Sequence, residues 1–322
     1  MELVILIVIF GLLFDFTNGF HDVANVVATP IATKIIRPVT AITVASIFNF
    51  IGATQISGVA QTIATGLVEA HSATQWMVLA ALIGAILWNF ATWYLGIPSS
   101  SSYALIGGLI GAALVSGGMK NVLWGGLIYK VLIPMVLSPI LGGGIAWSFM
   151  KLLLKLSKRD RPLYRHLQLG SSATVALSHG LNDAQKSMGI ITLGLFSAGM
   201  IQTPHIPLWV IGACAIVMAL GTASGGFRII RTMGFEITKL KPIDGFAAEF
   251  SSSVIMLIAS FLGMPLSSTH VIVGSITGVG TARSAKQVRW TTTHKLIIAW
   301  ILTLPGSALV SGLIYFVLNN YK

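Results

Sequence analysis

The chain has 322 residues, of which 55% are hydrophobic and only 9% are charged. A typical soluble domain has about 25% charged residues, so this composition predicts an integral membrane protein in which nearly the whole chain takes part. The net charge of +11 does not indicate nucleic-acid binding, because the basic residues gather in short loops between apolar segments and no basic helix or aromatic stacking platform is present.

A membrane-spanning helix needs about 20 mostly apolar residues, and we expect ten such segments along the chain. They are 3–28, 39–66, 76–95, 98–118, 122–152, 171–197, 206–227, 244–263, 265–282 and 296–318. The first segment lacks a preceding basic region and a small-residue cleavage site. It is therefore interpreted as a retained span and not as a signal peptide.

Basic residues in the connections predict the orientation. The four basic stretches are Lys34 to Arg37, Lys155 to Arg165, Arg228 to Lys241 and Arg283 to Lys295. With ten simple crossings and an outside N-terminus, all four fall on the cytoplasmic side, as the positive-inside rule requires. The sequence therefore predicts a multi-pass protein of the cytoplasmic membrane. A segment that enters and leaves on one face would change the number of crossings.

The two halves of the chain resemble each other. "GFHDVANVVAT" (19–29) matches "GLNDAQKSMGI" (180–190), and "IPSSSSYALIGGLIG" (97–111) matches "MPLSSTHVIVGSITG" (264–278). Because five segments per half is an odd number, the second half has the opposite orientation, which is a recurrent plan of secondary transporters. We predict an all-α polytopic membrane protein with repeats at 1–154 and 170–322, joined by a basic cytoplasmic linker at 155–169.

Four acidic residues lie inside or at the edge of apolar segments: Asp15, Asp22, Asp183 and Glu249. A charge at membrane depth costs a few kcal/mol or more and therefore points to function. The strongest candidates are Asp22 and Asp183, because they occupy equivalent positions in the two repeats. Asp15 fits a place near interfacial water equally well.

The serine tracts "PSSSS" and "PLSST" each end one apolar run and begin another. Proline stops the incoming helix and suits the first turn of the next one, while serine and threonine cap its N-terminus. The free N–H groups of such a helix start attract anions. Two starts facing each other near the midplane would fit a tetrahedral oxyanion.

Three histidines, His21, His179 and His270, lie at the polar clusters. They lack the spacing of a zinc site, so no metal centre is predicted. We expect them to donate hydrogen bonds or to titrate.

Several motifs together resemble the inorganic phosphate transporter (Pit) family, of the low-affinity bacterial type. They are "GFHDVAN", "SHGLNDAQKSMGIITL", "GTASGGFRIIRTMG", "GFAAE" and "PLSSTH", and they extend from residue 19 over nearly the whole chain. The resemblance implies an inverted repeat with two helical hairpins that carry the Ser/Thr-rich tips. It also implies import of inorganic phosphate by symport with Na⁺ or H⁺ and alternating access, with no enzymatic activity and no other cofactor.

The resemblance further assigns site residues. Phosphate would be bound by Ser100, Ser101, Ser268, Thr269, Asn25, Asn182 and Gln185. Coupling cations would be held at Asp22 and Asp183, with Asn25 beside them. Roles in gating or charge compensation are expected for Lys186, His21, His270 and Glu249. The physical reason for coupling is that a dianion entering a low-dielectric site needs neutralisation, which bound cations supply.

The repeat symmetry is broken at three positions, where His21 matches Asn182, Tyr103 matches His270, and Asn25 matches Lys186. We hypothesise that Lys186 is a built-in cation that leaves one exchangeable site at Asp22, or that it replaces sodium coupling by proton coupling. The alternative is a lysine that extends to the membrane interface.

Other substrates and classes remain open at this point. Sulfate or a metal–phosphate complex are alternative substrates, although phosphate is favoured because it can donate a proton to a carboxylate at neutral pH. An anion channel is an alternative of another class, disfavoured by the inverted repeat and the buried carboxylates. The expected partners are phosphate and membrane lipid, and a homo-oligomer is compatible with the sequence.

Overall fold

The computed structural model describes residues 2–156 and 162–320, and these residues form helices and connections without a named strand. The α-helices are α1 (Glu2–Ala32), α2 (Pro38–Ala53), α3 (Gly58–Thr65), α4 (Gln75–Tyr94), α5 (Ser101–Gly117), α6 (Trp124–Leu127), α7 (Ile133–Leu156), α8 (Pro162–Ser197), α9 (Leu208–Ser224), α10 (Phe227–Phe235), α11 (Pro242–Phe261), α12 (Ser268–Arg283) and α13 (Trp290–Asn320). A π-helical turn at Ile128–Leu132 joins α6 to α7. The predicted all-α class is confirmed.

The helices have the length and apolar character of a membrane protein. Within the described residues, six helices are long and apolar enough to cross a membrane, or eight if the bent pairs α2–α3 and α9–α10 each count as one span. Each of the ten predicted segments coincides with a helix or a bent pair. The segment expected at 171–197 begins earlier, at Pro162, so helix α8 includes the end of the expected linker. Residues 157–161 of that linker lie outside the described part of the chain.

The distribution of side chains is the reverse of that in a soluble protein. Large apolar side chains of α13, including Ile298, Leu313 and Phe316, are more than half exposed. Carboxylates such as Asp22 and Glu249 are buried. Because lipid is the solvent for the outer surface, charged groups are placed in the interior, where other protein groups can compensate them.

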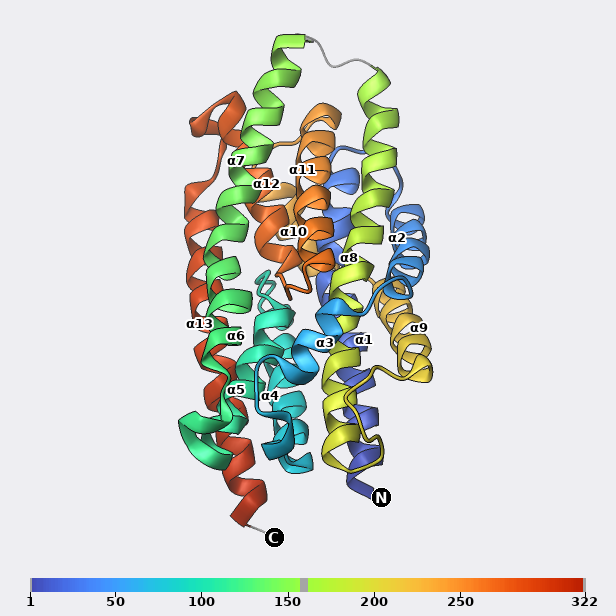
Figure 1. Ribbon diagram of the computed structural model, residues 1–322. Helices are drawn as coiled ribbons and strands as arrows, with labels where there is room; N and C mark the ends of the chain where they lie inside the picture. Colours follow the sequence, from blue (N-terminus) through green and yellow to red (C-terminus); the bar gives the residue numbers. More distant parts are fainter. Residues whose placement is uncertain (1, 157–161, 321–322) are drawn as a thin grey trace.

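Two helical hairpins turn back inside the molecule. The first hairpin (α4–α5) comes from the end that carries both termini, and the second hairpin (α11–α12) comes from the opposite end, so that their tips meet near mid-height (Figure 1). The tips are in contact, since the Ser102 hydroxyl donates to the Leu266 carbonyl at 3.2 Å. Non-helical backbone is tolerated at this depth because protein surrounds it.

The prediction of ten simple crossings is therefore wrong for these four helices, because each pair enters and leaves at one end. In the described chain, α1, α6–α7, α8 and α13 run from end to end, and the bent pairs α2–α3 and α9–α10 are part of the path of the chain between the two ends. Three of them belong to each half. The number per half stays odd, so the inverted relation between the halves is retained.

The connection between α1 and α2 and the connection between α12 and α13 lie at the end opposite the termini (Figure 1), together with the ends of α7 and α8 that carry the linker. Arg228, expected in one of the basic loops, is instead on α10 beside the first hairpin. Its guanidinium donates to the Tyr94 carbonyl at 2.6 Å.

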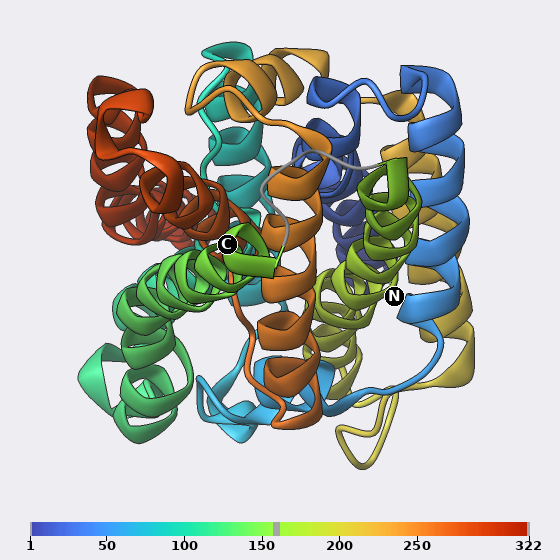
Figure 2. The same ribbon diagram turned by 90° about the horizontal axis from the view of Figure 1, so that it is seen from above.

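The two halves interlock, because the first helix of each half packs against the second helix of the other: α1 against α9, and α8 against α2. Viewed from above, α8 lies between the orange second hairpin and the blue α2 (Figure 2). Repeat-related glycines allow this approach. A Cβ on Gly19 would lie 2.6 Å from the Met218 carbonyl, and one on Gly180 would lie 2.2 Å from the Asn49 carbonyl.

Candidate functional site

The polar centre of the molecule lies where α1 and α8 pass the two hairpin tips. Helix α1 contributes His21, Asp22 and Asn25, helix α8 contributes His179, Asp183 and Lys186, and the tips contribute Ser99 to Ser102 and Ser267 to Thr269. The interlocked packing of the halves brings these four segments together, although they are far apart in the sequence.

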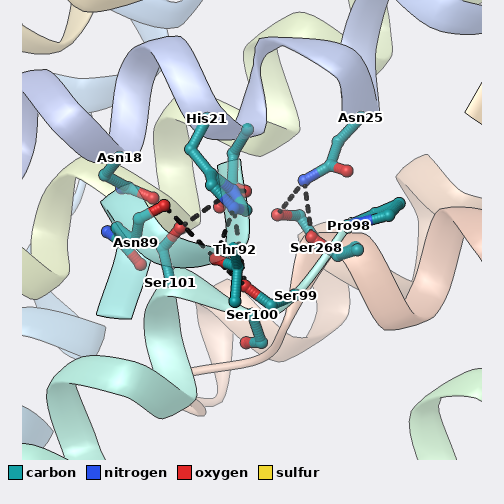
Figure 3. A network of polar contacts seen from close by, with 12 residues as sticks. Asn18, His21, Asn25, Asn89, Thr92, Pro98, Ser99, Ser100, Ser101 and Ser268 are labelled. Atoms are coloured by element: carbon teal, nitrogen blue, oxygen red, sulfur yellow. Dashed lines mark hydrogen bonds and ion pairs between the residues drawn. The ribbon is translucent and has the colours of Figure 1, made fainter. Parts of the chain in front are cut away.

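On α1, the side chain of His21 connects Asp22 to the first hairpin. Its Nδ1 lies 2.7 Å from a carboxylate oxygen of Asp22 and 3.4 Å from the Ser101 hydroxyl. Its Nε2 lies 3.3 Å from the Thr92 hydroxyl and 3.4 Å from the Ser99 hydroxyl (Figure 3). The imidazole thus holds the Asp22 carboxylate in place beside the tip.

Asn25 connects α1 to the second hairpin. Its amide group donates to the hydroxyls of Ser268 and Thr269, both at 3.0 Å. Figure 3 shows the Asn25 amide directed at Ser268, on the other side of the site from Ser101. One helix of the first half thereby contacts both tips.

On α8, both carboxylate oxygens of Asp183 are engaged. One contacts the ammonium group of Lys186, and the other lies 2.7 Å from Nε2 of His179 and accepts from the Ser268 hydroxyl at 2.7 Å. The Lys186 ammonium group also donates to the Ser102 hydroxyl at 2.5 Å and to the Leu266 carbonyl at 2.9 Å. The alternative in which Lys186 extends to the interface is wrong, because its side chain is buried between the tips.

The serine tracts start helices, as expected. Ser100 caps α5 by accepting from the Tyr103 amide at 3.2 Å, and Ser267 caps α12 by accepting from the His270 amide at 3.3 Å. The caps are equivalent residues of the two repeats. Two helix N-termini, each with a positive dipole end, therefore flank the site.

The site is closed in this structure. The residues that line it are almost fully buried, with exposures between 0% and 2% for Asp22, Asn25, Ser101, Ser268 and Asp183. Ligand atoms of Asp22, His179 and Asp183 lie within 4.8 Å of one another. Two carboxylates and an imidazole therefore converge in a space that water does not reach from outside.

Two predicted phosphate ligands have other contacts. The side-chain oxygen of Gln185 accepts from the Val59 amide at 2.8 Å and the Ala60 amide at 3.1 Å, so it caps the start of α3. The Asn182 amide donates to the Ser260 hydroxyl at 3.1 Å and to the Met264 carbonyl at 3.2 Å. Both residues thus support the elements around the second hairpin instead of contacting the serine and threonine hydroxyls of the two tips.

Two further predicted residues lie away from the centre. His270 stacks on Trp300 with ring centroids 4.1 Å apart. His270 and Trp300 line a largely apolar cavity of about 690 Å³ between α7, α12 and α13.

Glu249, on α11, accepts four side-chain hydrogen bonds, from Thr29, Gln168, Ser171 and Ser172. Thr29 is seven residues after Asp22 on α1, which corresponds to about 10 Å of helix. Glu249 therefore lies beyond the centre along α1, and it links α1, α8 and α11.

Sequence reasoning expected His179 to donate a hydrogen bond or titrate but did not include it among the site residues, and it did not single out Ser102 or Thr92, although all three contact the centre. A signal existed for His179, because it is four residues before Asp183 and such pairs share one helix face. Ser102 belongs to the recognised serine tract. Thr92 gave no signal, because only the fold of the hairpin brings it to His21.

Comparison with known proteins agrees with this architecture. A family model described as the phosphate transporter family matches residues 18–162 and 155–311, which is one match for each half. The chain is 44% identical to a probable low-affinity inorganic phosphate transporter of Bacillus subtilis, covering 98% of this chain and 97% of that protein. A protein of the same description from Rhizobium meliloti is 44% identical and covers 95% of this chain and 93% of its own length.

One solved structure, described as the sodium-dependent phosphate transporter, superposes with a TM-score of 0.92 at 27% identity and full coverage of both chains. The relatives are named as transporters and not as enzymes. The family match covers most of the chain and the identity to these relatives exceeds 40%, so the chain belongs to the phosphate transporter family.

Proposed function

We propose that this protein imports inorganic phosphate across the cytoplasmic membrane by symport with a cation, Na⁺ or H⁺, through alternating access. The observation that carries the proposal is the meeting of two serine-capped helix starts with a buried pair of aspartates at the interface between inverted repeats. In secondary transporters, substrate and coupling ion bind at such a repeat interface near the midplane.

Phosphate would lie between the two hairpin tips. The hydroxyls of Ser100, Ser101, Ser268 and Thr269 and the amide group of Asn25 supply hydrogen bonds to it. The helix N-termini of α5 and α12 add backbone N–H groups and favourable dipoles. In this closed state Asn25 already holds Ser268 and Thr269, so phosphate binding exchanges contacts within the protein for contacts with the anion.

The coupling cation would bind at Asp22. Its carboxylate contacts His21 and lies near His179 and Asp183, but no lysine or arginine among the described residues forms an ion pair with it. A cation there lowers the cost of bringing an anion to the tips. An empty Asp22 carboxylate repels the anion, so the two movements are coupled.

Alternating access requires the tips to move, because the site is closed on both sides here. Each hairpin approaches from a different end of the molecule (Figure 1), so withdrawal of one tip opens the site to one side only. The site at the interface between inverted repeats is typical of a carrier and argues against the alternative of an anion channel.

A metal–phosphate complex is the second candidate substrate, and one observation favours it. Asp22, His179 and Asp183 bring together oxygen and nitrogen atoms, which are ligands that divalent cations accept. Sulfate, the other alternative, fits the hydroxyls equally well but has no proton to donate to the neighbouring carboxylates.

The test is uptake of radiolabelled phosphate into liposomes that contain the purified protein, with Na⁺, H⁺ and divalent-metal gradients varied one at a time. We expect uptake driven by one of the monovalent gradients and competition by phosphate in excess of sulfate. Uptake that requires a divalent metal would support the metal–phosphate complex. The absence of uptake under every gradient would overturn the proposal.

The matched variants are Asp22→Asn and Glu236→Gln. Asp22→Asn is expected to reduce gradient-driven uptake at least about 100-fold, since removing one partner of a buried carboxylate–cation pair costs about 3 kcal/mol or more. Glu236→Gln, on a partly exposed residue, is expected to leave uptake unchanged.

A further inference from the structure

The feature that the phosphate site alone does not explain is Lys186. It is one of the largest fully buried side chains, with 1% exposure, and it lies on a helix that crosses the molecule. A buried ammonium group is costly unless it is paired and hydrogen-bonded. Its presence at the centre of the molecule therefore requires a compensating set of oxygens.

Those oxygens are of the kind that bind an alkali cation in a transporter. The ammonium group contacts a carboxylate oxygen of Asp183, the hydroxyl of Ser102 and the backbone carbonyl of Leu266. In secondary transporters, Na⁺ is coordinated by unwound backbone carbonyls beside broken helices, and Leu266 lies in the non-helical tip of the second hairpin.

The internal repeat allows Lys186 to be compared with the equivalent residue of the first half. Lys186 occupies the position that Asn25 occupies in the first half, and Asp183 occupies the position of Asp22. The neutral Asn25 amide contacts the second hairpin, while the charged Lys186 contacts both tips. The half that contains Asp22 lacks a side chain equivalent to the lysine.

The two aspartates therefore differ in how their charge is compensated. Asp183 has one carboxylate oxygen against Lys186 and the other against His179 and Ser268. A free cation bound to the first oxygen together with Ser102 and Leu266 would therefore have to displace the lysine. With the histidines left aside, Asp22, Asp183 and Lys186 together carry one negative charge. One mobile cation balances it.

We propose that the Lys186 ammonium group permanently occupies the second of two repeat-related cation sites, so that Asp22 alone holds an exchangeable coupling cation. This proposal rests on the proposed function and specifies its stoichiometry. Each phosphate moves with one cation fewer than in a carrier whose two aspartates both hold free ions. The tethered cation also links Asp183 to the two tips.

The test is the number of Na⁺ ions bound per chain, measured with radiolabelled Na⁺ on purified protein at saturating phosphate. The wild-type protein is expected to bind at most one Na⁺. Lys186→Asn, which copies Asn25 into the second half, is expected to bind one more than the wild type, because Asp183, Ser102 and Leu266 are then free to bind it. The added ion should also raise the Hill coefficient for Na⁺ in phosphate uptake.

Lys151→Asn is the matched control, since Lys151 is exposed on α7 and lies over the Trp147 ring. It should leave the number of bound ions unchanged. Two Na⁺ ions bound by the wild-type protein would overturn the proposal, and this measurement does not depend on the folding of any variant. The proposal would also be overturned by a monodisperse Lys186→Asn protein that binds no additional Na⁺.

If Lys186 served only as a direct phosphate ligand and not as a tethered cation, the experiment would give a different result. Lys186→Asn would then raise the KM for phosphate without changing the number of Na⁺ ions bound, which would overturn the tethered-cation proposal. Failure of the proposed function is distinguishable from both results, because it appears as a wild-type protein that takes up no phosphate under any gradient.

Discussion

The same carboxylate chemistry serves different purposes at three buried residues. Among the residues that the structure describes, Asp22 pairs with His21, and Asp183 pairs with Lys186. Glu249 accepts hydrogen bonds from four neutral side chains on two other helices. A carboxylate with that many donors is well compensated without a cation. Glu249 is therefore a structural link between α1, α8 and α11 in this closed state.

Replacement of Glu249 by alanine should destabilise the protein by on the order of 2–4 kcal/mol, because buried donors lose a charged acceptor and a cavity is left. Glu249→Gln should cost less, since the amide keeps the volume and one acceptor. Thermal unfolding in detergent micelles measures both variants. Equal stability of the alanine variant and the wild type would show that these hydrogen bonds do not support the fold.

At the scale of helices, close approach between the halves depends on small residues. Gly180 on α8 meets the backbone of α2 at Asn49, as its repeat partner Gly19 meets α9 at Met218. Small residues at such contacts let helix backbones pack closely in membranes. The aspartates lie three residues further along the same two helices, so this packing also sets their separation.

Gly180→Ala is expected to lower stability by about 1–3 kcal/mol, because its new methyl group would overlap a backbone carbonyl and force the helices apart. Gly170→Ala on the same helix is the control, since nothing lies within 4 Å of its added Cβ. It should be neutral or slightly stabilising through helix propensity. Thermal unfolding compares the two, and a Gly180→Ala protein as stable as Gly170→Ala would contradict the close packing.

At the scale of the whole molecule, the two ends differ in charge. Lys34, Arg37 and Lys286 lie in connections at the end opposite the termini, whereas Gln202 lies in the α8–α9 connection at the end that carries them (Figure 1). By the positive-inside rule, we expect the basic end to face the cytoplasm. Both termini would then face outward.

Cysteine labelling in intact cells tests this orientation. Cys214 is the only native cysteine and is buried, so the protein without an introduced cysteine should be labelled very little. A membrane-impermeant maleimide should label Gln202→Cys in intact cells, but should label Lys286→Cys only after permeabilisation. Both positions are exposed, and the reverse pattern of labelling would place the basic end outside.

Much of the fold and of the candidate site could be predicted from local features of the sequence. The hydrophobic segments, the odd number of segments in each half and the paired aspartates follow from composition and internal similarity, because lipid permits few residue types on the outside of a spanning helix. The serine caps at Ser100 and at Ser267, next to the predicted Ser268, follow from proline and serine chemistry at a helix start.

Long-range contacts could not be predicted in the same way. Hydropathy does not distinguish a pair of crossings from a hairpin that turns back at its tip, since both are pairs of apolar helices of similar length. The interior position of "PSSSS" and "PLSST" depends on how the halves interlock. The same holds for Gln185, whose amide caps α3 instead of facing the tips.

The sequence by itself determined the class of protein, the inverted repeat and the replacement of Asn25 by Lys186 in the second half, because these are properties of residue type and order. Only the tertiary structure decided where the Lys186 ammonium group lies, which is between Asp183, Ser102 and Leu266. The physical reason is that a lysine side chain is long enough to reach either the membrane interface or the interior. The oxygens that hold it in the interior come from three segments that only folding brings together.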